Sequence, residues 1–244
     1  MSEPILALTQ AERERRWPNV QPKDAATMIV LDRTGRKPRV LMGRRHPGHK
    51  FMPDKFVFPG GRVEPADRRM VAAGALDGIC EDRLARFVAR PSLTRGRALA
   101  MAAIRETFEE TGMMFGAKGY GAPQVALEGP WTSFAEHGVF PDLEAVRFVA
   151  RAITPPRRPK RFDTRFFTID AAAVAQKIEG IIGPETELVE LRSVTFDEAR
   201  GLDLPSITQQ ILKDIEARLE QGFGRHLPVP FYYERNLVFR REWL

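Results

Sequence analysis

A single cysteine, Cys80, occurs among the 244 residues of the sequence. One cysteine cannot form an internal disulfide, which excludes a disulfide-stabilised secreted scaffold and fits a reducing compartment. No stretch approaches the roughly 18 consecutive apolar residues that a membrane-spanning helix requires. The start of the chain lacks the apolar core of a signal peptide and carries a charged run at 12–16 instead. We therefore expect a cytoplasmic protein without a membrane partner.

Histidine is also scarce, with four residues in all. His46 and His49 have no partner at a zinc-like spacing, so solvated loop residues are the favoured interpretation, and contact with a phosphate is left open. By contrast, 38 lysines and arginines stand against 32 acidic residues, a formal net charge of +6. A basic chain favours an anionic partner, which could be a polyphosphate metabolite, an anionic membrane or nucleic acid.

The most informative charge pattern lies at 105–112. If this stretch is helical, Glu106, Glu109 and Glu110 share one face and lie close enough to bind one cation. Gly112 then supplies a C-terminal stop. Three apolar residues fall on nearly the opposite face: Met101, Ile104 and Phe108. Three acids at this spacing would, on their own, be typical of a solvated helix face.

A second stretch, 56–64, is predicted to be a short buried strand that breaks into a glycine loop at Gly60 and Gly61. Together with the Arg-Glu-x-x-Glu-Glu-x-Gly run at 105–112, this loop resembles the signature of the Nudix hydrolases. In that signature a glycine, five residues and a glutamate precede seven residues and the Arg-Glu run. The joint match carries more weight than the acidic helix alone.

The sequence departs from the signature in two main ways. Asp67 stands where the first glutamate belongs, which keeps the charge and shortens its reach. Between Asp67 and Arg105 lie 37 residues where the signature has seven. A subgroup of Nudix hydrolases that cleaves coenzyme A and its thioesters carries an insertion of this kind, and the run Phe51-Met52-Pro53 before the glycine loop also resembles that subgroup. Thr107 replaces the usual apolar residue.

The resemblance implies a site for Mg²⁺ or Mn²⁺ on the acidic helix face, since such hard cations favour oxygen ligands. The implied metal ligands are Glu106, Glu109, Glu110 and a backbone carbonyl at Gly60. Catalytic roles are expected for Glu106, Glu109 and Arg105, with Glu106 either a ligand or the group that orients water. Arg105 is expected to pair with a carboxylate of this segment, such as Glu109, and to fix its orientation. The general base is left open among three acids: Glu185, Glu187 and Glu190.

The resemblance also implies an α/β fold, a Nudix-type α/β/α sandwich with a mixed sheet. We predict one domain over 1–244, with its core at about 24–200 and a helical insertion at about 68–96. A C-terminal helical extension is expected at about 197–244, beginning after a cap at Thr195. Its clearest part is an amphipathic helix at 205–221.

The expected function is hydrolysis of coenzyme A or acyl-CoA at the diphosphate. Alternatives are an ADP-ribose or NADH diphosphatase and, in another class, a non-catalytic Nudix-fold protein that binds a nucleotide or RNA. A complete set of three glutamates favours an enzyme. Nucleic acid is disfavoured because the aromatics near the basic runs alternate as strand residues do.

A basic loop at 155–161 is the candidate for recognising the substrate. It places four cations within five positions, stiffened by prolines: Arg157, Arg158, Lys160 and Arg161. A solvated loop is the simpler interpretation for any single one of them. As a group they could bind the 3′-phosphate that coenzyme A carries and that ADP-ribose and NADH lack, because arginine suits bidentate phosphate recognition.

Overall fold

The computed structural model describes residues 3–10, 15–49, 52–123 and 128–244. Phe51 of the Phe51-Met52-Pro53 run and most of the charged run at 12–16 lie outside the described residues. Among the described residues, no helix is both long and apolar enough to cross a membrane.

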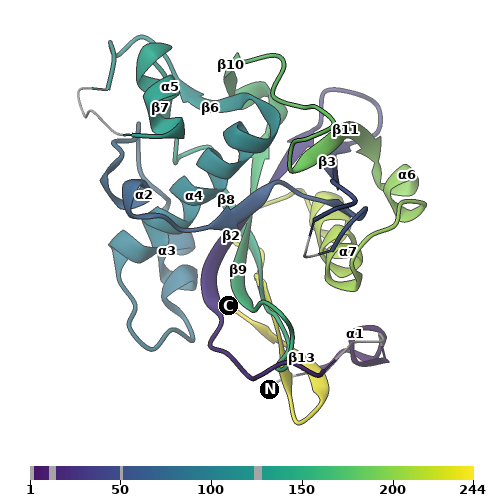
Figure 1. The fold of residues 1–244 in the computed structure, drawn as a ribbon. Coiled ribbons are helices and arrows are strands. Elements are labelled where there is room, and N and C mark those ends of the chain that lie inside the picture. Colours follow the sequence, from purple (N-terminus) through teal and green to yellow (C-terminus); the bar gives the residue numbers. More distant parts are fainter. Residues whose placement is uncertain (1–2, 11–14, 50–51, 124–127) are drawn as a thin grey trace.

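A mixed sheet, ten-stranded in the described part of the chain, forms the centre (Figure 1). Its main path runs β1-β13-β12-β8-β9-β2-β3-β11, with β5 beside β2 and β4 beside β3. The pairs β2–β9 and β8–β12 are parallel, and the others are antiparallel. The strands are β1 (Glu3–Pro4), β2 (Lys23–Asp32), β3 (Arg39–Arg45), β4 (Phe56–Val57), β5 (Gly60–Arg62), β8 (Arg147–Ile153), β9 (Phe162–Asp170), β11 (Leu188–Thr195), β12 (Pro230–Arg235) and β13 (Val238–Trp243).

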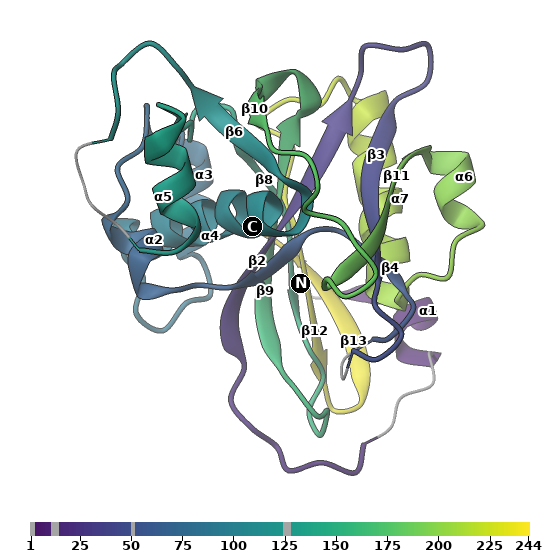
Figure 2. The ribbon, with the colours of Figure 1, turned by 45° about the horizontal axis from the view of Figure 1, so that its top comes forward.

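Helices cover both faces of this sheet, as Figures 1 and 2 show. One layer contains α2 (Pro65–Arg69), α3 (Gly78–Ala85), α4 (Leu93–Thr111) and α5 (Pro130–Glu136); the other contains α6 (Phe196–Arg200) and α7 (Ser206–Glu220), with α1 (Leu6–Gln10) nearby. A separate buried apolar cluster lies on each side. The predicted α/β/α arrangement with a mixed sheet is therefore confirmed.

Helix α4 is the central element of the first layer. Ser92 caps its start by accepting a hydrogen bond from the Arg95 amide, and Gly112 ends it in the left-handed region at φ 74°. A β-carbon at Gly112 would lie 2.1 Å from the Ile178 carbonyl oxygen, so both the backbone angle and the close approach require glycine. The three residues predicted to face the core are buried: Met101, Ile104 and Phe108. Beyond Gly112 a small sheet joins β6 (Met113–Ala117), β7 (Phe140–Pro141) and β10 (Val174–Lys177).

The insertion is less helical than predicted. Only α3 lies wholly within 68–96, and the stretch 70–77 has no helix although its alanines follow a helical spacing. Its apolar residues are buried although they form no helix: Met70 and Leu76 belong to the same apolar cluster as the buried residues of α4. At its end the insertion merges with α4, the helix that carries the three glutamates, which already begins at Leu93.

The C-terminal region is where the prediction was wrong. The helix expected at 205–221 is present as α7, and Thr195 caps α6 through a capping box with Glu198. After Glu220, however, the chain forms β12 and β13 instead of more helix, and these strands join the main sheet beside β8. Alternating aromatic residues, Phe231 and Tyr233 on one side and Tyr232 on the other, suit a strand buried on both faces. The number of domains stays a prediction.

Candidate active site

The last two turns of α4 present the three glutamates toward β5. Glu110 is 8% exposed, and the side chains of Glu106 and Glu109 are 15% and 36% exposed. Glu110 is therefore buried and Glu106 half-buried, while Glu109 stays exposed. Burying carboxylates is costly unless they are paired with cations or hydrogen-bonded.

Arg105 is the cation that meets this face, and its guanidinium is 1% exposed. Its Nη1 donates to Glu109 Oε1 at 2.6 Å and lies 3.1 Å from Glu106 Oε1. Its Nη2 donates to the carbonyl of Arg62 at 2.8 Å, at the end of β5. The predicted pair between Arg105 and Glu109 is thus present, and Arg105 links the helix to the glycine segment; its catalytic role stays a prediction.

Asp67 holds Arg105 from the other side. It is fully buried, and its Oδ1 accepts from Arg105 Nε at 2.8 Å and from Trp131 Nε1 at 3.2 Å. Its Oδ2 accepts from the Glu64 amide at 2.7 Å, which completes a capping box at the start of α2. The shorter aspartate therefore still reaches the arginine, because α2 brings its backbone close to α4.

The glycine segment is a strand and not the predicted loop. Residues 60–62 pair with Ala25, Ala26 and Thr27 of β2. A β-carbon at Gly60 would lie 2.5 Å from the Ala26 carbonyl oxygen, and one at Gly61 would lie 2.3 Å from Glu106 Oε1. Glycine is thus needed at position 60 for the backbone to pack against β2, whereas a side chain at 61 would have to displace the Glu106 carboxylate. The Gly60 amide donates to Glu110 Oε2 at 3.2 Å.

The negative charges of Glu106, Glu110 and Glu187 repel one another beside α4. Burial raises the pKa of Glu110 well above its usual value, and the neighbouring charges of Glu187 and Glu106 raise it further. Burial also raises the pKa of Glu106 to about 7, against the opposing effect of Arg105. Buried acids with raised pKa values in a cavity are typical of functional sites.

A divalent cation fits the chemistry of these donors. Carboxylates that repel one another, next to backbone at Gly60 and Gly61, form the oxygen-rich environment that Mg²⁺ or Mn²⁺ prefers. Among the described residues, no three histidine, cysteine or acidic side chains converge closely enough to hold a metal ion in their present rotamers. Binding therefore requires glutamate side chains to rotate.

Glu187 faces the acidic helix from the start of β11. Its Oε1 lies 3.0 Å from Arg45 Nη2 and 3.4 Å from His49 Nε2, and all three line the same cavity as Glu106 and Glu109. The other two candidate bases lie elsewhere: Glu190 pairs with Arg44 and Arg192, and Glu185 is exposed outside this cavity.

Arg45 is the site residue that sequence reasoning missed, and His49 is one for which only a possible phosphate contact was raised. Arg45 is the last residue of β3, paired with Leu188 of β11, and His49 lies in the loop that follows. The only sequence signal was the run of basic residues at 45–50, which lies shortly before the glycine segment. A strand pairing between residues about 140 positions apart cannot be read from local spacing.

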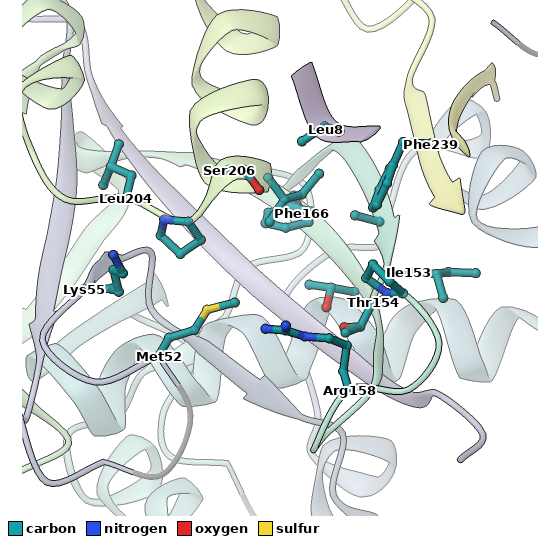
Figure 3. Close-up of a pocket in the computed structure, with 15 residues that line it drawn as sticks. Leu8, Met52, Lys55, Ile153, Thr154, Arg158, Phe166, Leu204, Ser206 and Phe239 are labelled. Atoms are coloured by element: carbon teal, nitrogen blue, oxygen red, sulfur yellow. The ribbon is translucent and has the colours of Figure 1, made fainter. Parts of the chain in front are cut away.

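Two adjoining cavities form the candidate active site. The cavity beside the glutamates has a volume of about 420 Å³. Its neighbour, shown in Figure 3, has about 360 Å³ and is mainly apolar. The two share Met52, Thr154, Thr164, Phe166, Pro205 and Ile207. In Figure 3, Arg158 extends into the second cavity toward Met52, while Leu8 and Phe239 lie at its far end.

The four cations of the basic loop are not equivalent. Lys160 lines the cavity of the glutamates, and Arg158 lines the apolar one. Arg161 instead donates to the Thr154 and Val20 carbonyls and to the Asn19 amide oxygen, so it anchors the segment that leads into β2. Arg157 is exposed with φ at 59° and lines neither cavity. Of the four, Lys160 and Arg158 line the cavities, and the phosphate-binding role of the group stays a prediction.

Comparisons with known proteins agree with this geometry. No family model matches the chain. A Caenorhabditis elegans protein described as nudix hydrolase 7 is 27% identical over 157 residues, which cover 59% of this chain and 43% of that relative. The match thus spans less than half of the relative's length. A NUDIX hydrolase from Alicyclobacillus acidocaldarius has a solved structure that is 25% identical with a TM-score of 0.57, covering 80% of this chain and 90% of its own.

The fold of this chain matches the architecture of the Nudix hydrolases. Both similar proteins support the Nudix hydrolase family, a class of enzymes that act on phosphoanhydrides. The coenzyme A subgroup, which rested on the insertion and the Phe51-Met52-Pro53 run, stays a prediction.

Proposed function

We propose that this chain is a Mg²⁺- or Mn²⁺-dependent hydrolase that cleaves coenzyme A or acyl-CoA at the diphosphate. The products are adenosine 3′,5′-bisphosphate and phosphopantetheine, or its acyl form. The observation that carries the proposal is the continuity of the two cavities: one is lined by Glu106, Glu109, Arg45 and His49, and the other is apolar with Arg158 inside it. A diphosphate joined to an adenosine that carries a further phosphate matches that sequence of surfaces, with the nucleoside in the apolar cavity and its 3′-phosphate at Arg158. We place the enzyme in the cytoplasm.

Glu106, Glu109 and Glu110, with the Gly60 carbonyl, would hold the metal. The chemistry such an ion supplies when bound is neutralisation of the diphosphate charge and polarisation of its phosphoryl oxygens. Arg105 orients Glu109 and Glu106 through the contacts described above. Arg45 and His49 would bind phosphate oxygens. Glu187 would accept the proton of the attacking water as a phosphorus–oxygen bond of the diphosphate breaks.

A substrate panel tests the proposal directly. Coenzyme A, an acyl-CoA, ADP-ribose and NADH are incubated with the enzyme and Mg²⁺, and the products are identified by mass. We expect adenosine 3′,5′-bisphosphate from the first two at the highest kcat/KM. Preferred cleavage of ADP-ribose or NADH would replace the coenzyme A assignment, and binding without cleavage of any substrate would indicate a non-catalytic protein.

Glu187→Gln is expected to lower kcat by roughly 10²- to 10⁴-fold with little change in KM, because a general base acts only on the chemical step. Steady-state kinetics on the preferred substrate measures this. Glu185→Gln and Glu190→Gln are the matched controls and should keep kcat within about twofold. A loss of kcat in Glu190→Gln that equals or exceeds the loss in Glu187→Gln would contradict the assignment.

Arg158→Gln combined with Lys160→Gln is expected to raise KM for coenzyme A by about tenfold, the scale of one lost charged hydrogen bond. KM for dephospho-CoA, which lacks the 3′-phosphate, should change little. The preference of the unmodified enzyme for coenzyme A should also weaken as salt rises, since exposed charges are screened. Arg157→Gln serves as the control in the same loop. An equal rise on both substrates would instead assign the two cations to the diphosphate.

A further inference from the structure

A small cavity outside the candidate active site is surrounded by arginines. It has a volume of about 20 Å³ and shares no lining residue with the two cavities described above. Its cations come from four separate parts of the chain: Arg83 of α3, Arg147 at the start of β8, Arg218 in the last turn of α7 and Arg225 in the loop that follows.

Arg218 is the most enclosed of the four, with 8% exposure. Its Nη1 donates to the Pro228 carbonyl at 2.6 Å and its Nη2 to the Leu227 carbonyl at 3.3 Å. Its Nε is buried and has no hydrogen-bond partner among the described residues. Burial, and then the charge of Arg83, lowers the pKa of Arg218 to about 10. A buried cation with an unused donor is costly and unusual.

Arg147 is half-buried, and no carboxylate in the described part of the chain lies within ion-pair distance of it. Its pKa is lowered first by burial and then by the charges of Arg225 and Arg33. Asp77 is the one acidic residue that lines the cavity, and it lies 3.5 Å from Arg225 Nη1 while also accepting the Cys80 amide as the cap of α3. Of these four arginines of the described chain, Arg225 alone lies within ion-pair distance of that carboxylate, and Arg83 donates to the carbonyls of Arg225 and His226 at 2.7 and 2.8 Å.

We propose that this cavity is a binding site for a phosphate-type oxyanion, with one oxygen entering between Arg147 and Arg218. A volume of about 20 Å³ is sufficient for one oxygen-sized atom and too small for a whole phosphate, so the remaining oxygens stay at the mouth. Guanidinium groups match phosphate geometry, and they are more weakly hydrated than ammonium groups. The bound anion would offset the repulsion among the arginines and join the insertion to β8 and to the end of α7.

The test is a phosphate titration without divalent metal, followed by calorimetry and by thermal unfolding at constant ionic strength. For the unmodified protein and for Arg90→Gln, an exposed arginine elsewhere in the insertion, we expect saturable binding and a rise in Tm of roughly 5 °C or more. Arg147→Gln should lose that binding event and most of the rise. Without phosphate its Tm should equal or exceed that of the unmodified protein, because one repelling charge is gone. Both arginine variants retain the residues of the candidate active site, so phosphate bound there contributes equally to each.

Equal phosphate binding and equal Tm shifts in Arg147→Gln and Arg90→Gln would overturn the proposal. An Arg147-dependent rise that chloride reproduces at the same ionic strength would also overturn it, since the site would then hold any small anion. AMP, added in place of phosphate, distinguishes the source: a rise that Arg147→Gln abolishes assigns the site to phosphomonoesters, and no such rise assigns it to the inorganic ion. Arg225→Gln, at an exposed position, repeats the test if Arg147→Gln does not fold.

Discussion

Replacing Glu109 or Glu110 by glutamine is expected to lower kcat by at least about 10²-fold. Each change removes a charged oxygen ligand from a site that neutralises the diphosphate, and several kcal/mol of transition-state stabilisation are lost with it. For Glu110→Gln, stability without metal should stay the same or rise, because Glu110 is 8% exposed and is repelled by Glu106 and Glu187. Steady-state kinetics with Mg²⁺ and thermal unfolding in a chelator measure the two effects.

The opposite signs of these effects make the test specific to a functional site. A change that only damages packing would lower activity and stability together. Glu220→Gln, exposed at the end of α7, is the control for loss of one negative charge. Near-normal turnover in both Glu109→Gln and Glu110→Gln would remove these residues from the mechanism, whatever the identity of the substrate.

Asp67→Ala is expected to cost about 3–5 kcal/mol of unfolding free energy, the scale observed when one partner of a buried ion pair is removed. Arg105 would keep its charge in the interior without Asp67, and the Trp131 indole N–H would lose its acceptor. Urea denaturation measures the loss, and Asp82→Ala, an exposed aspartate of α3, is the control. Activity should fall as well, because Arg105 orients Glu109. A loss below about 1 kcal/mol would show that Arg62 and the glutamates alone hold the arginine.

The acidic helix could be predicted closely from the sequence because its information is local. The spacing of Glu106, Glu109 and Glu110 and the stop at Gly112 require only one helix, and both the apolar face and the Arg105–Glu109 pair follow from the same periodicity. The strand at 60–62 was missed because glycine gives no strand signal of its own. This strand can pair with β2 because Gly60 has no side chain: a β-carbon there would collide with the β2 backbone at Ala26.

The side of the cavity that faces α4 is formed by Arg45, His49 and Glu187, and it depends on pairing between strands far apart in the sequence. Glu187 was one of three equivalent acids in the sequence, and the pairing of β11 with β3 is what brings it to Arg45 and His49. The basic loop at 155–161 also shows what local sequence cannot predict. Its four cations look equivalent in the sequence, yet Arg161 donates hydrogen bonds to the backbone carbonyls of Thr154 and Val20. The C-terminal strands did have a local signal in Phe231, Tyr232 and Tyr233, which could have been used.

The parallel pairing of β2 with β9 has a consequence for how the chain folds. β2 lies near the start of the chain, and its partner along nearly its whole length begins at Phe162. Such distant pairings close a large loop before any contact compensates for the lost entropy, so folding is expected to be slow for a protein of this size. During synthesis β2 has an open edge until β9 leaves the ribosome. That apolar edge can pair with other chains in the meantime, which makes the nascent protein a natural client for chaperones.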